Sequence, residues 1–250
     1  MNRSKYLIVN ADDFGQSAGI NRGIVEAHER GIVTSASLMV RWPAANDAAA
    51  YAREHRELSV GLHFDLGEWA YRDETWAPIY EVCETEDGEC VRDELARQLD
   101  LFRSFVGSDP THLDSHQHVH LSEPARSVCL EFSRELEIPL RGCAASVRYC
   151  GDFYGQCEDG SRYPEGISVE RLVQILATLP DGVTELACHP GREVDLDTMY
   201  RDEREREVES LCDARVPFAL AAHGIELISF NHLKRFHKAN SAFNASASRS

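Results

Sequence analysis

The sequence predicts an α/β protein built as a TIM-like (β/α) barrel that is incomplete or distorted, with about seven strands. Short apolar runs alternate with longer segments of helical spacing, which is typical of a parallel sheet with crossover helices. Polar residues also fall at or just after the ends of predicted strands: Asp12, Asp13, His63, His116 and His189. Strand ends converge on one mouth in a barrel, so a barrel explains this pattern better than an open doubly wound sheet. Periodicity alone leaves the open sheet as the alternative.

The predicted elements follow from apolar spacing and from turn residues. Ile20, Ile24 and Ala27 are spaced for one helix face, and Gly31 suits the residue that follows a helix. The predicted strands are Lys5–Asn10, Ser35–Val40, Leu58–His63, His112–His116, Ile138–Arg141, Val183–Cys188 and Ile225–Ser229. The predicted helices are Ile20–Arg30, Ala44–His55, Arg92–Val106, Glu123–Leu136, Ser168–Leu179 and Asp202–Asp213.

A chain of 250 residues fits one large domain better than two small ones. We expect a single catalytic barrel over residues 1–239, with insertions near 67–90 and 144–166. Both insertions follow strands and carry aromatic residues, so we expect them on the face that holds the site. Residues 240–250 are small and polar, and we expect them to form a flexible tail.

The chain is acidic, with a formal net charge of −16. The negative electrostatic field of such a chain repels nucleic acids and anionic membrane surfaces, so we expect neither of them as a partner. We expect a neutral or cationic substrate instead. The apolar run at residues 6–9 is too short for a secretory signal, and no stretch approaches the roughly 18 apolar residues of a membrane span. These features predict a cytoplasmic protein.

Eight cysteines are present without a C-x-x-C pair, which favours reduced structural thiols in a cytoplasmic protein. The equal spacing of Cys143, Cys150 and Cys157 leaves a second metal site as a minor alternative.

The segment 111–120 carries metal-ligand residues at every second position. Alternate side chains of an extended strand point to one face, and imidazole is the commonest metal ligand. Residues two apart on a strand are about 6.6 Å apart, whereas a metal–nitrogen bond is about 2.1 Å, so one ion can be reached by one or two of these histidines. The alternating residues are His112, Asp114, His116, His118 and His120.

Three further positions extend this pattern. Asp12 and Asp13 follow the first strand, His63 ends the third, and His189 ends a strand before Pro190. Each of them taken alone is also typical of a turn or a structural side chain. Together the positions provide one aspartate and two histidines as ligands, which leaves an open coordination place for water, with a free carboxylate and a free imidazole for proton transfer. These groups suit the hydrolysis of an amide or ester.

Four motifs resemble one family. They are N-A-D-D-F-G at 10–15, G-L-H-F at 61–64, T-H-L-D-S-H-Q-H-V-H at 111–120 and C-H-P at 188–190. They look like those of the YdjC-like carbohydrate deacetylases, a group that includes chito-oligosaccharide deacetylases and deacetylases linked to hopanoid synthesis. The first and third motifs are long and specific, and the resemblance runs from the first strand to about residue 230.

The resemblance implies a TIM-like barrel, one divalent metal ion (magnesium or zinc) and removal of acetyl from an N-acetylated amino sugar. Carried over by position, Asp13, His63 and His116 would bind the metal. Asp12 would be the base that activates water, and His189 would be the acid that protonates the departing amine. Family members are often homodimers, so the resemblance also implies a second copy of the chain as partner.

Two other functions stay open at this point. A glycoside hydrolase could use Asp12 with a second carboxylate such as Asp114, but it needs two opposed carboxyl groups. A non-catalytic module could bind a metal or a sugar without turnover. Aromatic rings commonly stack on sugars, and the candidate contacts in the insertions are Trp69, Tyr71, Trp76 and Tyr154.

Overall fold

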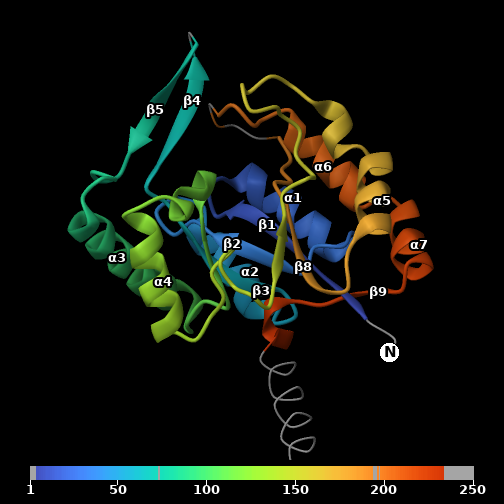
Figure 1. Ribbon diagram of the computed structural model, residues 1–250, viewed down its shortest axis with the longest axis horizontal. Coiled ribbons are helices and arrows are strands. Elements are labelled where there is room, and N and C mark those ends of the chain that lie inside the picture. The colour runs from blue at the N-terminus through green and yellow to red at the C-terminus, as the bar shows by residue number, and fades with distance from the viewer. Residues whose placement is uncertain (1–3, 73, 194–195, 197, 234–250) are drawn as a thin grey trace, which may run out of the picture.

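The computed structural model describes residues 4–72, 74–193, 196 and 198–233. Its main sheet has seven strands: β1 (Lys5–Phe14), β2 (Ser35–Leu38), β3 (Ser59–Phe64), β6 (Leu113–Ser115), β7 (Arg148–Cys150), β8 (Gly182–Cys188) and β9 (Ile225–Leu227). Every ladder in it is parallel, in the order β6-β3-β2-β1-β8-β7, and β9 pairs with the first part of β1. The sheet curls (Figure 1), and its end strands β6 and β7 form no ladder with each other over the described residues. The predicted incomplete barrel is confirmed.

Helices surround this sheet on its outside (Figure 1). α2 packs on α3 and α3 on α4, whereas α6 packs on α1 and α5 packs on α7. The first helix begins where Ser17 accepts a hydrogen bond from the Ile20 amide, and α3 ends at Gly107 in the left-handed conformation that glycine favours. The helices are α1 (Ala18–Glu29), α2 (Ala45–Glu54), α3 (Gly88–Val106), α4 (Ala125–Glu135), α5 (Val169–Thr178), α6 (Glu203–Leu211) and α7 (Arg215–Ala222), with 3₁₀ turns η1 (His116–Leu121) and η2 (Pro164–Ile167).

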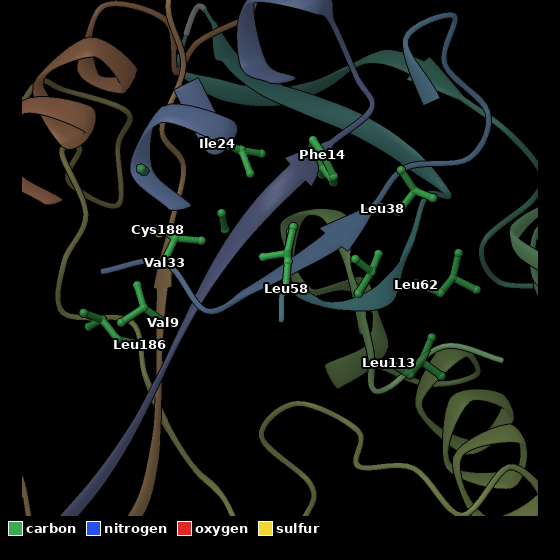
Figure 2. Packing of buried hydrophobic residues seen from close by; sticks show 14 of the residues in the cluster. Val9, Phe14, Ile24, Val33, Leu38, Leu58, Leu62, Leu113, Leu186 and Cys188 are labelled. Carbon is green, nitrogen blue, oxygen red and sulfur yellow. The ribbon is translucent and has the colours of Figure 1, made fainter. Parts of the chain in front are cut away.

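The first strand shows how the sheet separates an apolar layer from the barrel interior. Leu7 and Val9 are fully buried in the large hydrophobic cluster between strands and helices, where Val9 lies near Leu186 (Figure 2). Successive side chains of a strand point to opposite faces, so Ile8 and Asn10 face inward. Both faces of β1 are covered, and its buried residues therefore follow one another without the polar alternation of a half-exposed strand.

Apolar side chains fill the interior at the amino ends of the strands. Ile8 packs there with Val147, Ile228 and Phe230, and the Phe230 ring stacks on His112 with centroids 3.8 Å apart. The segment after β9 thus closes this end of the barrel. The interior nearer the carboxyl ends is polar, and it leads into the site described below.

The histidine-rich segment differs from the predicted strand His112–His116. Only residues Leu113–Ser115 are extended, and His116 begins η1. Gln117 and His118 have positive φ angles of 48° and 56°, which turn the chain away from the strand direction. The alternation of histidines therefore does not produce one ladder of side chains.

The predicted strand Ile138–Arg141 is wrong. It is reduced to one isolated bridge between Leu140 and Leu113. Pro139 lies within it, and proline lacks the amide hydrogen that a strand ladder needs. The strand that continues the sheet is β7, inside the predicted insertion 144–166.

The predicted insertion 67–90 contains an antiparallel hairpin of β4 (Gly67–Arg72) and β5 (Thr75–Glu81). This hairpin extends away from the barrel at the side of α3 (Figure 1). The following helix α3 begins at Gly88, earlier than predicted, because Asp87 caps it by accepting from the Glu89 and Cys90 amides. Helix α7 was not predicted from the sequence.

None of the helices in the described part of the chain is long and apolar enough to cross a membrane. The eight cysteines are free thiols. The predicted tail at 240–250 lies outside the described residues, and the single domain over 1–239 stays a prediction.

Gly61 of β3 leaves room for the His112 ring, which gives a test of the packing inside the barrel. A Cβ added to Gly61 would lie 2.5 Å from His112 Cε1. We expect Gly61→Ala to lower the free energy of unfolding by about 1–3 kcal/mol through overpacking, as measured by urea denaturation. An unchanged denaturation midpoint would contradict this packing.

Candidate active site

A cavity of about 680 Å³ opens at the carboxyl ends of the strands. All five residues that the sequence singled out line it: Asp12, Asp13, His63, His116 and His189. They come from the ends of β1, β3, β6 and β8, because parallel strands present these ends at one mouth of a barrel. The structure thus brings together every predicted site residue, although they are spread over most of the chain.

A bulge at the end of β1 places two adjacent carboxylates in the same cavity. Neighbouring residues of a regular strand point to opposite faces, yet Asp12 and Asp13 both line the cavity. The pairing register of β1 with β2 shifts between Ala11 and Phe14, and Asp13 has a positive φ of 67°. Left-handed backbone at a non-glycine residue is held by its surroundings and is common at functional sites.

Asp13, His63 and His116 form a compact group of metal-ligand type. Their ligand atoms all lie within 4.8 Å of one another, and all three residues are buried. Asp13 Oδ1 is 3.3 Å from His63 Nε2 and 3.0 Å from His116 Nδ1. His116 Nε2 is buried without a hydrogen-bond partner among the described residues. The unpartnered Nε2 lies 3.9 Å from Glu68 Oε2. The other ring nitrogen, Nδ1, and His63 Nε2 flank one oxygen of Asp13, and two imidazole nitrogens beside a carboxylate oxygen fit a divalent cation.

His63 is oriented by a second carboxylate. Its Nδ1 lies 2.8 Å from Asp114 Oδ1, which turns Nε2 toward Asp13. Burial disfavours the imidazolium, but the carboxylates of Asp114 and Asp13 raise the pKa of His63 to about 10. A carboxylate that fixes the ring of a histidine in this way is typical of metal ligands. Asp114 from the histidine-rich segment thus orients His63, and it does not line the cavity itself.

Arg141 holds Asp12 in place from inside the barrel. Its guanidinium donates to both oxygens of Asp12 at 2.6 and 2.7 Å, and it also pairs with Asp114 and Glu185 at 2.7 Å each. Burial alone would raise the pKa of Asp12, and Arg141 brings that pKa below its usual value. Asp12, His63 and Asp114 form a second group of metal-ligand type, but Arg141 already supplies the counter-charge there. The first group is therefore the better cation site.

His189 faces Asp12 across the cavity. Its Nε2 lies 3.7 Å from Asp12 Oδ2, and its buried Nδ1 has no hydrogen-bond partner among the described residues. The Glu207 carboxylate accepts from the His189 backbone amide and from the Tyr200 hydroxyl. The ring centroids of Tyr154 and Tyr200 lie 5.4 and 5.3 Å from the centroid of the His189 imidazole. These contacts hold the ring beside Asp12, in reach of a substrate.

The remaining histidines of the segment 111–120 lie outside the compact group; His118 lines the cavity beside Tyr149, whereas His112 and His120 do not line it. Burial lowers the pKa of His112, His118 and His120 to about 4, so their rings are neutral. His120 bridges Ser115 Oγ at 2.5 Å and the Arg141 carbonyl at 3.1 Å, which ties η1 to the arginine. One histidine of the four predicted in the alternation therefore belongs to the compact metal-type group.

Sequence reasoning missed two buried arginines. Arg141 ends a predicted strand, as His63 does, but an arginine at a strand end does not indicate a metal ligand. Arg204 lies on α6, where alternating glutamate and arginine residues resemble a solvated helix. The structure buries it, and its guanidinium donates to Asp13 Oδ2 at 2.7 Å and to the Tyr200 carbonyl at 2.8 Å. This contact leaves Asp13 Oδ1 facing the histidines.

Comparison with known proteins identifies the family. The family model described as YdjC-like protein matches residues 6–222, and the chain therefore belongs to the YdjC-like family. It is 34% identical to a carbohydrate deacetylase of Geobacillus stearothermophilus, over 94% of this chain and 99% of the relative. It is 32% identical to a chitooligosaccharide deacetylase of Klebsiella pneumoniae (strain 342), over 89% and 97%.

Solved structures share the fold. A protein of Enterococcus faecalis V583, described as a candidate for cellobiose-phosphate cleavage, matches with a TM-score of 0.73 and 28% identity over 92% of this chain and 99% of its own. A family 4 carbohydrate esterase from Streptomyces lividans in complex with acetate matches with a TM-score of 0.56 and 14% identity over 91% and 92%. The second similarity concerns the fold alone.

The buried arginine network gives a test of stability. Arg141→Met leaves the carboxylates of Asp12, Asp114 and Glu185 without their common counter-charge, so we expect a loss of about 3–5 kcal/mol in the free energy of unfolding. Arg215→Met is the matched control, because Arg215 also contacts two carboxylates but is exposed, and we expect little change there. Equal effects of the two substitutions in chemical denaturation would contradict the role of Arg141.

The compact group gives a test of metal binding. We expect His63→Ala to weaken zinc or magnesium affinity by at least about 100-fold, since residues that only orient ligands already contribute about 10–100-fold. Isothermal titration calorimetry on metal-free protein measures this affinity. His223→Ala at the exposed end of α7 is the control, and an affinity that falls equally in both variants would argue against this site.

Proposed function

We propose that this protein is a metal-dependent hydrolase that removes the acetyl group from an N-acetylated amino sugar. The observation that carries the proposal is the convergence of Asp13, His63 and His116 beside Asp12 and His189 in one cavity. The relatives described as carbohydrate and chitooligosaccharide deacetylases support the sugar amide as substrate.

Each side chain has a task in this reaction. Asp13, His63 and His116 would hold the divalent ion, which polarises the acetyl carbonyl and acidifies water. Asp12 accepts the proton of the attacking water, and Arg141 keeps its carboxylate ionised until then.

His189 donates a proton to the departing amine nitrogen. His189 Nε2 lies 3.7 Å from Asp12 Oδ2. The base can therefore take a proton from the attacking water while the acid protonates the amine nitrogen, and both of these atoms are bonded to the same tetrahedral carbon. Burial lowers the pKa of His189 to about 4, so its ring is neutral at rest, and the proton that it gives to the amine nitrogen is the one that Asp12 takes from water. The amine nitrogen then leaves as the free amino group of the sugar, and the acetyl group leaves as acetate.

The charges of the lining favour a neutral or cationic sugar. Glu68 and Glu158 line the cavity in addition to the two aspartates. Arg204 lines it as well, but its guanidinium is engaged by Asp13 and by backbone carbonyls. An anionic sugar would be repelled by the carboxylates of Glu68 and Glu158, consistent with the acidic composition of the whole chain.

The geometry does not favour a glycoside hydrolase. That reaction needs two carboxyl groups on opposite sides of a scissile bond. Asp12 and Asp114 instead share one guanidinium, with Arg141 Nη2 2.7 Å from an oxygen of each. Asp114 is fully buried and lies outside the cavity lining.

Three finer features belong to the same proposal. The ion is magnesium or zinc, since two imidazoles with one carboxylate suit zinc and carboxylate with water suits magnesium. The protein acts in the cytoplasm, as its sequence predicts. It acts as a homodimer, as the family resemblance implies.

Substitution of the base separates catalysis from metal binding. We expect Asp12→Asn to lower acetate release from N-acetylated amino sugars by about 100- to 10,000-fold, the usual contribution of a general base. Metal content stays unchanged, because the three proposed ligands are intact. An enzymatic acetate assay and metal analysis of the same preparation measure both quantities. Unchanged acetate release from Asp12→Asn would overturn the role of this carboxylate.

Chelation separates the proposal from the alternatives. We expect excess EDTA to abolish acetate release and zinc or magnesium to restore it. Full activity in EDTA with a sugar product that keeps its acetyl group would identify a glycoside hydrolase. Metal binding without acetate release from any N-acetylated sugar would identify a non-catalytic module.

A further inference from the structure

The imidazole of His116 lies between two carboxylates. Its Nδ1 is 3.0 Å from Asp13 Oδ1, and its Nε2 is 3.9 Å from Glu68 Oε2. This Nε2 is buried and has no hydrogen-bond partner among the described residues. A buried polar atom without a partner is rare in folded proteins and calls for an explanation. The carboxylate beside it is the first group to consider.

Glu68 is itself a buried carboxylate without a cationic partner. The residue is 5% exposed, and its Oε1 accepts from the Thr198 hydroxyl at 2.8 Å. Over the described part of the chain, Glu68 forms an ion pair with no lysine or arginine. Burying a carboxylate without a counter-charge is costly. Two unsatisfied polar groups, an imidazole nitrogen and a carboxylate, therefore lie side by side.

Gln117, which follows His116 in the chain, fixes the position of Glu68. Its side-chain amide accepts from the Trp69 backbone N–H and donates to the Trp69 carbonyl, both at 2.8 Å. The pairing of β4 with β5 shifts register between Glu68 and Trp69, and both of these residues line the cavity. The hydrogen bonds and the irregular register together hold the Glu68 carboxylate beside the His116 ring.

The other histidine of the compact group shows what such a carboxylate does. His63 Nδ1 lies 2.8 Å from Asp114 Oδ1, and His63 Nε2 faces the same oxygen of Asp13 at 3.3 Å. His116 has the same arrangement with its nitrogens exchanged, because Nδ1 faces Asp13 and Nε2 faces Glu68. A metal-binding imidazole keeps one nitrogen free of its proton, and a carboxylate at the other nitrogen holds the proton there.

We propose that Glu68 is the positioning residue of His116 and accepts a hydrogen bond from its Nε2–H when a divalent cation is bound. This inference rests on the metal site of the proposed function and deepens it. The Glu68 carboxylate favours the tautomer that leaves Nδ1 free for the ion, and its negative charge offsets the charge that the ion adds. The 3.9 Å separation has to shorten by about 1 Å for this hydrogen bond. The proposal links the metal site to the β4–β5 hairpin, which carries Glu68.

Glu68→Gln tests this role through two effects of opposite sign. Glutamine keeps the size of the side chain and a partner for Thr198, but it removes the charge. We expect the metal-free protein to become more stable to heat, because an unpaired buried charge is lost. We expect zinc affinity to fall about 10- to 100-fold, because His116 loses the group that orients it. Differential scanning calorimetry and isothermal titration calorimetry on metal-free protein measure the two quantities.

Two further variants separate this role from a general effect of charge. Glu158 also lines the cavity but is exposed, so we expect Glu158→Gln to leave zinc affinity nearly unchanged. Thr198→Val removes the hydroxyl that holds Glu68 but keeps the carboxylate, so we expect a smaller loss than in Glu68→Gln. An equal fall in zinc affinity for Glu68→Gln and Glu158→Gln would overturn the proposal.

The place of the ring proton of His116 is a readout that a merely structural role would not change. Nuclear magnetic resonance of zinc-loaded protein with isotope-labelled histidine reports it. We expect this proton to reside on Nε2 and to exchange slowly with water in the wild type, and to exchange faster in Glu68→Gln. A ring proton on Nδ1 in the zinc-loaded wild type would contradict the proposal.

Metal binding and acetate release are measured separately, so the two proposals can fail separately. If the wild type binds zinc and releases no acetate, but Glu68→Gln weakens zinc binding, the role of Glu68 stands and the deacetylase proposal fails. If acetate is released but the wild type and Glu68→Gln bind zinc equally, the role of Glu68 fails alone. If the wild type binds neither zinc nor magnesium, both proposals fail.

Discussion

The guanidinium of Arg141, buried inside the barrel among three carboxylates, is the interaction on which the site depends. Removing a charge from water is costly unless a partner compensates it, and Asp12, Asp114 and Glu185 are all buried. Arg141 contacts each of them within 2.7 Å. It therefore permits a charged interior in a place that many barrels fill with aliphatic side chains.

The consequences of this pairing extend to the proposed metal ligands. Arg141 holds Asp114, Asp114 orients His63, and His63 turns its free nitrogen toward Asp13. Arg204 restrains the opposite oxygen of Asp13. Two arginines on separate elements thus fix two adjacent carboxylates of β1 for different tasks. Asp12 is paired and faces His189, whereas Asp13 shares an oxygen with the histidines.

The predicted part of the site rests on residue type and on strand ends. Asp12, Asp13, His63, His116 and His189 were all placed at strand ends, and the structure brings them into one cavity. The unpredicted part rests on backbone geometry. A regular strand would point the two aspartates to opposite faces, and only the bulge with positive φ at Asp13 directs both inward. Arg204 escaped prediction because a helix rich in charges looks solvated until its packing is known.

The alternation of strands and helices, the acidic character of the chain and the residues that carry the chemistry can all be predicted from the amino-acid sequence, because they depend on local apolar spacing and residue type. Tertiary structure decided which groups meet. It shortened the histidine strand at Ser115 and reduced the strand around Leu140 to a single bridge. It also placed the aromatic hairpin against Gln117. Contacts between residues far apart in the chain depend on how the strands curl and how the helices pack, and this arrangement cannot be predicted from local sequence patterns.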